Sequence, residues 1–199
     1  MRLPGSFRQT LANFALPIAF AWVAVASFHA LYAPVDPTVF APKAHSFGAI
    51  RMRLKLPGTW GGIDEPILIC GKPGKASLVY IKLFYHAKAK VGIEFWGFRA
   101  FESPEFDLPA QDAQIELACS IPALYPAAGD PEWQAMSAAA ETHLLRNYII
   151  AVDGVVRLSG QVDYGQDPHM PVYLGVNPLG GSFVSNEFTG KILSASQKH

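Results

Sequence analysis

Short runs in which polar and apolar residues alternate occupy most of the chain after residue 45, and they predict β-strands. In Ile50–Leu56 every second residue is apolar, and each residue between them is Arg or Lys. This period of two is typical of a strand with one buried face and one face in water. Other alternating or short apolar runs predict strands at Ile67–Ile69, Leu78–Tyr85, Val91–Trp96, Gln114–Cys119, Pro171–Val176 and Phe188–Leu193.

The clearest pair of strands is a hairpin near residue 150. Tyr148–Val152 and Val155–Leu158 are rich in β-branched residues and are separated by Asp153 and Gly154. This dipeptide suits a type I′ turn, because both central residues of that turn need a positive φ. We therefore expect the two runs to pair directly.

One segment, Asp130–Arg146, is predicted to be helical. Asp130 is its expected cap, Pro131 its first residue, and alanines fill its middle. The remaining signals are eight or nine short strands without alternating helices. This organisation predicts an all-β fold, an antiparallel two-sheet sandwich of the jelly-roll kind.

The N-terminal residues form an uninterrupted apolar run instead. Leu11–Leu31 is about 21 residues long, and a helix of that length spans roughly 30 Å, the thickness of bilayer hydrocarbon. We predict a cytoplasmic stub and transmembrane helix in residues 1–33, a Pro-rich linker in residues 34–44 and the sandwich domain in residues 45–199. The alternative is a signal peptide that is cleaved after residue 26, because Ala24-Val25-Ala26 has the form of a cleavage site.

The N-terminal arginines predict the orientation of the chain. Arg2 and Arg8 precede the apolar run, and the next charged residue is Asp36. By the positive-inside rule the N-terminus is cytoplasmic and the domain is periplasmic or extracellular. The expected product is a single-pass membrane protein whose partners are the bilayer and other subunits of a membrane complex. His29, near the outer end of the span, is either an interfacial histidine or an axial ligand to a tetrapyrrole metal.

Composition excludes several classes of protein. The 199 residues include 16 basic and 16 acidic side chains, so the formal net charge is zero. Nucleic-acid-binding proteins normally carry a basic excess, and we predict no nucleic-acid partner. Half of the residues are hydrophobic and 12% are aromatic, which excludes a disordered chain.

Two cysteines, Cys70 and Cys119, each follow an apolar run. In an exported compartment they are candidates for a disulfide, which would close a loop of about 50 residues and stabilise the fold by around 4 kcal/mol. The alternative is two buried free thiols that pack as small apolar groups. A zinc site is not expected, because the chain contains no C-x-x-C motif.

Three short motifs carry a family resemblance. They are the hairpin Ile149–Gly154, the segment Val172–Gly175 and the segment Phe188–Leu193. Their order and spacing are similar to the closing strands of the concanavalin A-like, laminin G-like jelly-roll family, over about residues 45 to 194. The resemblance implies two packed, curved antiparallel sheets, in which Gly175 and Gly190 admit a bulky neighbour or a crossing backbone.

Catalytic motifs are not found in the sequence. Members of this family that hydrolyse glucans carry a strand motif, E-x-D-x-x-E, whose alternate carboxylates share one face. Here Glu102 and Glu105 flank Pro104, which breaks the strand register. We interpret both as solvated loop carboxylates. With no nucleophile or phosphate-loop motif either, we predict no catalytic residue, no cofactor and no enzymatic activity.

No metal site is predicted, although one loop is a candidate for calcium. Asp163, Asp167 and the carbonyls of Tyr164–Gln166 place several oxygens close together. The alternative is a loop built from Asx-turns. We expect the second.

Four aromatic residues lie in loop-like stretches and are candidates for contact with a ligand or a partner. They are Trp60, Tyr125, Trp133 and Tyr164. Exposed aromatics serve as stacking platforms for sugars and mark protein interfaces. The alternative for each is a place in the core, where tryptophan is usually found.

These observations favour one function and leave two others open. We predict a non-catalytic, membrane-anchored accessory or scaffold subunit whose β-sandwich docks on a partner membrane complex. The alternative is a carbohydrate-binding, lectin-like module at the cell surface. A degenerate glycoside hydrolase is a minor alternative.

Overall fold

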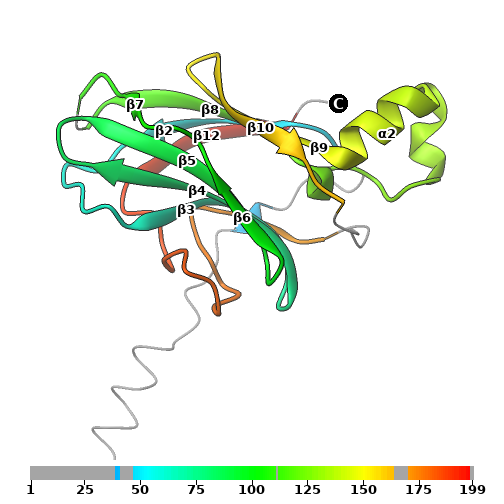
Figure 1. The fold of residues 1–199 in the computed structure, drawn as a ribbon, viewed down its shortest axis with the longest axis horizontal. Coiled ribbons are helices and arrows are strands. Elements are labelled where there is room, and N and C mark those ends of the chain that lie inside the picture. The colour runs from blue at the N-terminus through cyan, green and yellow to red at the C-terminus, as the bar shows by residue number, and fades with distance from the viewer. Residues whose placement is uncertain (1–38, 41–46, 111, 164–169, 198–199) are drawn as a thin grey trace, which may run out of the picture. The chain divides into compact units, whose positions relative to one another are not determined.

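Two antiparallel β-sheets form the body of the protein (Figure 1). The structure is a computed structural model, and it describes residues 39–40, 47–110, 112–163 and 170–197. Every strand pair that it describes is antiparallel. The prediction of an antiparallel two-sheet, jelly-roll-like sandwich is therefore confirmed.

We name the two sheets A and B. The chain crosses from one sheet to the other several times. Sheet A has the order β1-β11-β3-β4-β5-β6, with β7 also paired to β5, and sheet B has the order β10-β9-β8-β2-β12. The strands of sheet A are β1 Val39–Phe40, β3 Asp64–Lys72, β4 Lys75–Phe84, β5 Lys88–Phe95, β6 Arg99–Glu102, β7 Phe106–Asp107 and β11 Val172–Leu174. Those of sheet B are β2 Ile50–Lys55, β8 Gln114–Ser120, β9 Asn147–Val152, β10 Val155–Gln161 and β12 Lys191–Gln197.

The main hydrophobic core fills the space between the sheets. Ile50, Met52 and Leu54 are fully buried and face it, whereas the basic residues between them are exposed. Ile81 and Ile93 of sheet A belong to the same core. Burying a side chain of this size contributes about 1.5–3 kcal/mol, so the alternation seen in the sequence sets which face of β2 points inward.

The segment between β11 and β12 packs on the outer face of sheet A. We call residues 175–190 the covering segment. Ile69, Leu78 and Tyr80 point to this outer face and form a second apolar cluster with Val184 of the covering segment. The central strands are thus buried on both faces along part of their length, which explains why Leu78–Tyr85 is apolar almost throughout.

Two buried carboxylates hold the covering segment in place. Glu65, which is 6% exposed, accepts hydrogen bonds from the backbone N–H and the hydroxyl of Thr189, both at 2.9 Å. Glu94, which is 9% exposed, accepts one from the hydroxyl of Ser182 at 2.5 Å. A buried carboxylate is tolerated only with such partners, so these contacts specify where the segment crosses the sheet.

Gly175 and Gly190 allow the close approach that the family resemblance implied. A Cβ at Gly175, whose φ is +69°, would lie 3.0 Å from the Ile192 side chain. A Cβ at Gly190 would lie 2.4 Å from the carbonyl oxygen of Lys55. A larger residue at Gly190 would force two backbone segments apart, whereas at Gly175 it would be strained by the positive φ and would displace the end of the Ile192 side chain.

The predicted helix Asp130–Arg146 is two helices, so that prediction was wrong in its extent. Asp130 caps a 3-10 helix, η2, at Pro131–Ala135. A second cap follows: the hydroxyl of Ser137 accepts the N–H of Ala140 at 3.2 Å and begins α2, Ala138–Arg146. A further 3-10 turn, η1, lies at Pro122–Leu124. Serine as a cap competes with helix continuation, and the sequence analysis overlooked it.

The predicted hairpin is confirmed, and sheet B ends in a bulged strand on each side. β9 and β10 are joined by Asp153 and Gly154, with φ of 50° and 76°. The register shifts between Val156 and Leu158 in β10, and a similar shift occurs in β12. Such bulges bend a strand and increase its twist.

Strand boundaries differ from the prediction in several places: β3, β5 and β10 are longer than predicted, and β6 and β7 were not predicted. β12 begins at Lys191, three residues later than predicted, although Phe188 still packs in the main core from the covering segment. Val39–Phe40 lies in the predicted linker, yet it forms β1 and pairs with Val172 and Tyr173.

The predicted membrane segment, Leu11–Leu31, lies outside the described residues, and so does His29. Among the residues that are described, no helix is long and apolar enough to cross a bilayer. The anchor, the orientation of the chain and the role of His29 therefore stay predictions.

Gly92 provides a test of the packing on sheet A. It lies opposite Tyr80, and a Cβ at Gly92 would lie 2.1 Å from the Tyr80 ring. We expect Gly92→Ala to displace the ring and to lower the free energy of unfolding, measured with urea, by about 1–3 kcal/mol, the usual cost of overpacking. Gly61→Ala is the control, because its nearest contact would be 3.9 Å away. Equal stability of the two variants would contradict this packing.

Candidate functional site

The part of the outer face of sheet A that lies beside the covering segment carries a line of polar side chains from four strands. We call Asp64, Tyr80, Lys82, Lys90 and Glu102 the polar track. Strand pairing places Lys82 between Asp64 and Lys90, and it places Gly92 between Tyr80 and Glu102. Side chains opposite one another on the same face lie within reach, so the register alone brings these groups together.

The members of the polar track form one connected network. The Nζ of Lys82 lies 2.8 Å from Oδ1 of Asp64 and 3.2 Å from Oε1 of Glu102. The hydroxyl of Tyr80 donates to the same Glu102 oxygen at 3.2 Å. The Nζ of Lys90 lies 3.5 Å from the other carboxylate oxygen, Oε2. Glu102 is therefore the common acceptor of three donors.

This network favours the charged forms of its lysine and its carboxylate. Burial opposes the charge of Glu102, but the hydrogen bond and charge of Lys82, with help from Lys90 and Tyr80, keep the pKa of Glu102 below its usual value. Burial also opposes the charge of Lys82, yet its bonds to Asp64 and Glu102 keep its pKa above the ordinary value. Burial and the neighbouring carboxylates raise the pKa of Tyr80 far above its usual range.

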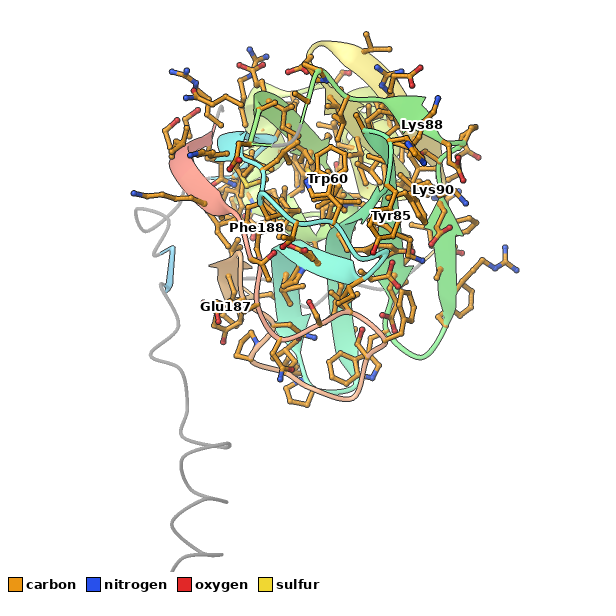
Figure 2. The ribbon with its side chains drawn as sticks, turned by 90° about the vertical axis from the view of Figure 1, so that its left-hand side faces the viewer. Trp60, Tyr85, Lys88, Lys90, Glu187 and Phe188 are labelled. Carbon is orange, nitrogen blue, oxygen red and sulfur yellow. The ribbon has the colours of Figure 1, made fainter. Side chains whose placement is uncertain are left out.

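Exposed aromatic rings lie near the polar track. The ring of Phe183 packs edge-on against Tyr80, with centroids 5.4 Å apart, and is 52% exposed. Tyr85, in the turn between β4 and β5, is 71% exposed. Figure 2 shows Tyr85, Lys88 and Lys90 on the same side of the molecule. The Phe183 ring of the covering segment therefore contacts the polar track directly, and Tyr85 lies in the turn that follows β4.

The turn that presents Tyr85 is strained. The next two residues, His86 and Ala87, both have positive φ, at 64° and 55°. That conformation costs an L-residue other than glycine roughly 1–2 kcal/mol. The backbone N–H of Gly62 donates to Leu83 at 2.8 Å and supports the turn from the neighbouring loop. Strain of this kind is often found where a turn has a function.

The polar track offers hydrogen-bond donors and acceptors whose pKa shifts do not bring them near neutral pH. A general acid or base works best with a pKa near the working pH. In the track the pKa of Glu102 is lowered, whereas the pKa values of Lys82 and Tyr80 are raised. In the described part of the chain, no group of three or more His, Cys, Asp or Glu side chains could hold a metal. What remains is an array of donors and acceptors beside exposed rings.

The structure places the predicted aromatic residues mainly as packing groups. Trp60 is 3% exposed, belongs to the main core and donates its ring N–H to the carbonyl of Pro57 at 2.7 Å. Trp133 is 5% exposed and stacks on Tyr125, with ring centroids 6.2 Å apart. Trp60 and Trp133 are too buried to offer a free ring face to a ligand. Tyr125 is partly buried and packs against the core. All three rings therefore agree with the alternative of a place in the core. Tyr164 lies outside the described residues.

Cys70 and Cys119 are free and buried, so the candidate disulfide is not formed in this structure. The thiol of Cys70 donates to the carbonyl of Ala123 at 3.2 Å. Burial raises the pKa of Cys70 to about 12 and that of Cys119 further. The thiolate is the reactive form, so neither sulfur is poised to react. Of the candidate calcium loop, Asp167 and Tyr164–Gln166 lie outside the described residues.

Most of the polar track was not predicted from the sequence. Glu102, interpreted as a loop carboxylate, is the last residue of β6 and faces Lys82 and Lys90. Tyr80 and Lys82 were assigned only to an apolar strand. Their spacing of two was a usable signal, since it places both on one face, but the partners of that face come from distant parts of the chain.

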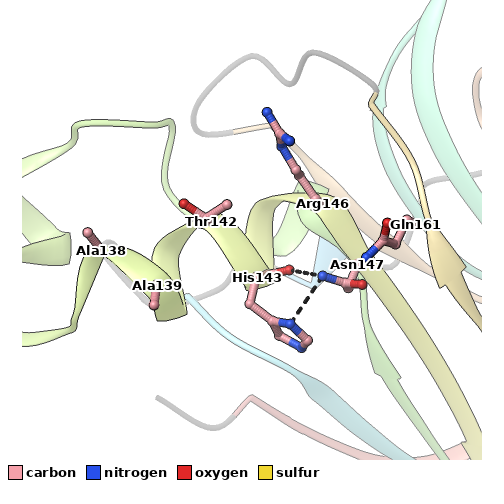
Figure 3. Close-up of a pocket in the computed structure, with 7 residues that line it drawn as sticks. All are labelled: Ala138, Ala139, Thr142, His143, Arg146, Asn147 and Gln161. Carbon is pink, nitrogen blue, oxygen red and sulfur yellow. Dashed lines mark hydrogen bonds between the residues drawn. The ribbon is translucent and has the colours of Figure 1, made fainter.

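A pocket with a volume of about 580 Å³ lies along α2 (Figure 3). Its polar lining includes His143, Arg146 and Asn147. The Asn147 amide donates to the His143 carbonyl at 2.6 Å and approaches its Nδ1 at 3.2 Å. Figure 3 shows His143 and Arg146 leaving the helix on different sides. These groups do not converge on one ligand position, so we prefer the polar track.

Among known proteins, similarity to this chain is found in solved structures but not in family models or curated sequences. No protein-family model matches the sequence, and no curated protein matches it. The Ruminococcus gnavus IT-sialidase CBM40, solved with alpha2,6 sialyllactose, is 15% identical with a TM-score of 0.46, over 76% of this chain and 75% of that one. An alginate lyase from Pseudomonas aeruginosa is 12% identical with a TM-score of 0.40, over 78% and 66%. Such likeness assigns no residue role here.

The ion pairs of Glu102 predict a dependence of stability on pH. Since its pKa is lowered by folding, ionised Glu102 stabilises the fold fully above its unfolded pKa of about 4.3, and this contribution is lost as the pH falls through the lower folded value. We expect Glu102→Gln to lower the free energy of unfolding by roughly 0.5–1 kcal/mol near pH 7, because the pairs are partly exposed.

Urea denaturation near pH 7 and near pH 3 measures this difference, which should shrink at the lower pH. Glu105→Gln is the matched control, since Glu105 is exposed and lies just beyond β6. It should leave the stability nearly unchanged at both values. A Glu102→Gln deficit that persists in acid would contradict the assigned pairs.

Proposed function

We propose that the domain is a non-catalytic carbohydrate-binding module, held at the outer surface of a membrane by residues 11–31. The observation that carries the proposal is the polar track with exposed rings beside it. Lys82, Lys90 and the Tyr80 hydroxyl supply donors around the Glu102 carboxylate. The rings of Phe183 and Tyr85 are open to solvent.

A sugar ring matches this surface chemically. Its hydroxyls both donate and accept hydrogen bonds, and its C–H faces are apolar enough to lie on an aromatic ring. Ligand sites in general combine apolar and aromatic surface with a few well-placed polar groups. Buried or half-buried donors that are already bonded to one another also lose little freedom when a ligand binds.

Charge balance favours a neutral sugar as the ligand. The two lysines of the polar track face two carboxylates, Asp64 and Glu102, at 2.8 to 3.5 Å. A strongly anionic ligand would have to compete with these carboxylates for the same ammonium groups. A neutral sugar can bridge them without separating the ion pairs.

The absence of catalysis is part of the proposal. It is supported by the directions of three pKa shifts. The pKa of Glu102 is lowered, and those of Lys82 and Tyr80 are raised, so ionised Glu102, charged Lys82 and neutral Tyr80 are all favoured near neutral pH. Removing a proton from Tyr80 or adding one to Glu102 is therefore unfavourable there. The expected behaviour is binding without turnover.

A glycan array followed by titration calorimetry on the full chain in detergent tests the proposal. We expect Tyr85→Ala and Phe183→Ala each to weaken binding of the best neutral glycan by about tenfold or more, equivalent to about 1.4 kcal/mol. Met136→Ala is the control, because Met136 is 47% exposed and lies far along the chain from the track, before α2. Equal affinity of all three variants, or no glycan bound, would remove the proposal.

A second candidate is the accessory subunit of a membrane complex. It is favoured by Ile63, which is 58% exposed in the loop before β3, near the turn that presents Tyr85. The cores of protein interfaces bury apolar side chains and are enriched in aromatic ones. The chain extracted in mild detergent would then give a native mass that includes a stoichiometric partner. We expect Ile63→Asp to release that partner while leaving glycan binding intact; a lone chain counts against this candidate.

A further inference from the structure

The outer face of sheet B carries a stripe of basic side chains. We call Arg51, Arg53 and Lys55 of β2 and Lys191 of β12 the basic stripe. The three β2 residues are exposed, alternating with core residues, and Lys191 lies opposite Lys55 in the paired strand. Two neighbouring strands therefore present four cations on one face.

These cations are only partly neutralised. Arg51 lies 3.3 Å from Glu116, and Lys55 lies 3.9 Å from Asp112. Arg53 donates instead to a neutral amide, that of Gln114, at 3.0 Å. Within the part of the chain that the structure describes, neither Arg53 nor Lys191 has a carboxylate within ion-pair distance.

Acidic side chains near the stripe are engaged on one side of it. Glu116 belongs to the adjacent strand β8, where it lies opposite Arg53 in register and forms its ion pair with Arg51. Asp153, at the tip of the β9–β10 hairpin, accepts the backbone N–H of Glu116 at 2.8 Å. The far side of the stripe, at β12, holds Lys191 and two serines, Ser194 and Ser196, opposite the arginines of β2.

Exposed apolar side chains accompany the stripe. Ile149 of β9 is 37% exposed, Val156 of β10 is 55% exposed and Leu193 of β12 is 40% exposed. Val156 pairs with Ala151, which shares the outer face with Ile149. Cations are attracted to an anionic membrane surface, and exposed apolar side chains can enter its headgroup layer.

The two outer faces differ in charge. On sheet A each lysine of the polar track lies within 3.5 Å of a carboxylate. On sheet B, Arg53 and Lys191 remain available for an external anion. The two sheets of a sandwich pack face to face, so their outer faces point in opposite directions.

We infer that the basic stripe lies against the anionic headgroups of the membrane that tethers the chain, and that it turns the polar track away from the lipid. This inference rests on the membrane tether of the proposed function. A tether raises the effective concentration of headgroups near the domain to about the millimolar range. Contacts by a few cations and apolar groups, too weak to recruit a free domain, then suffice to orient a tethered one.

The orientation is measurable on the full chain in lipid nanodiscs. A fluorophore is attached at Ser194→Cys, on the stripe, or at Ala100→Cys, which lies on the outer face of sheet A opposite Glu94. The native thiols do not compete for the label, because Cys70 and Cys119 are buried. A quencher on the lipid headgroup reports how close each label lies to the bilayer.

In discs with about 30% anionic lipid we expect the label at 194 to be quenched at least threefold more than the label at 100. The difference should vanish in neutral discs and in about 0.5 M salt, which screens exposed charges. It should also vanish in the double variant Arg53→Gln with Lys191→Gln. The charge-matched control, Arg99→Gln with Arg146→Gln, should keep it. Thermal unfolding of each variant verifies that the fold is retained.

Several outcomes would overturn the inference. Equal quenching at the two positions, or the same quenching in neutral and anionic discs, removes lipid as the occupant and leaves an acidic protein surface as the next to examine. A chain that does not enter the discs removes the tether and this inference together. Glycan titration of the same protein in detergent is independent of these results, so failure of the polar track as a binding site would be seen separately.

Discussion

The buried carboxylate of Glu65 is the contact on which the rest of the architecture depends. It lies in β3 of sheet A, and it accepts both the backbone N–H and the hydroxyl of Thr189, just before β12 enters sheet B. A single side chain thus fixes the point where the chain crosses between sheets. Because a buried charge without partners is so unfavourable, this crossing has little freedom. The covering segment is then stretched across one part of sheet A and leaves the other part open.

The candidate site in the open part depends on a second constraint, the absence of a side chain at Gly92. The Tyr80 ring occupies the space that a Cβ would take, and its hydroxyl reaches Glu102 on the neighbouring strand. Glu102 in turn collects Lys82 and Lys90. Tyr80 therefore connects the two features. Its ring belongs to the second apolar cluster, and its hydroxyl belongs to the polar track.

The sequence predicted what depends on near neighbours. The period of two in β2 and the turn at Asp153 and Gly154 both involve interactions within a few residues, and both predictions hold. The burial of Trp60 and the place of Glu102 depend on strands 20 or more positions away, for example the pair Lys82 and Glu102. A single sequence does not show which distant residues pair in the fold. The polar track was therefore visible only once strand register was known, although the alternation of Tyr80 and Lys82 pointed to a polar face.

The bulges at the two margins of sheet B have a consequence for several copies of the domain that meet. Strand margins expose unpaired N–H and C=O groups, and straight ones recruit further strands. Here the register shifts at Val156–Leu158 in β10 and at Ile192–Ser194 in β12, so neither margin offers a regular ladder. Copies at high concentration can therefore come close together without joining edge to edge into a continuous fibre.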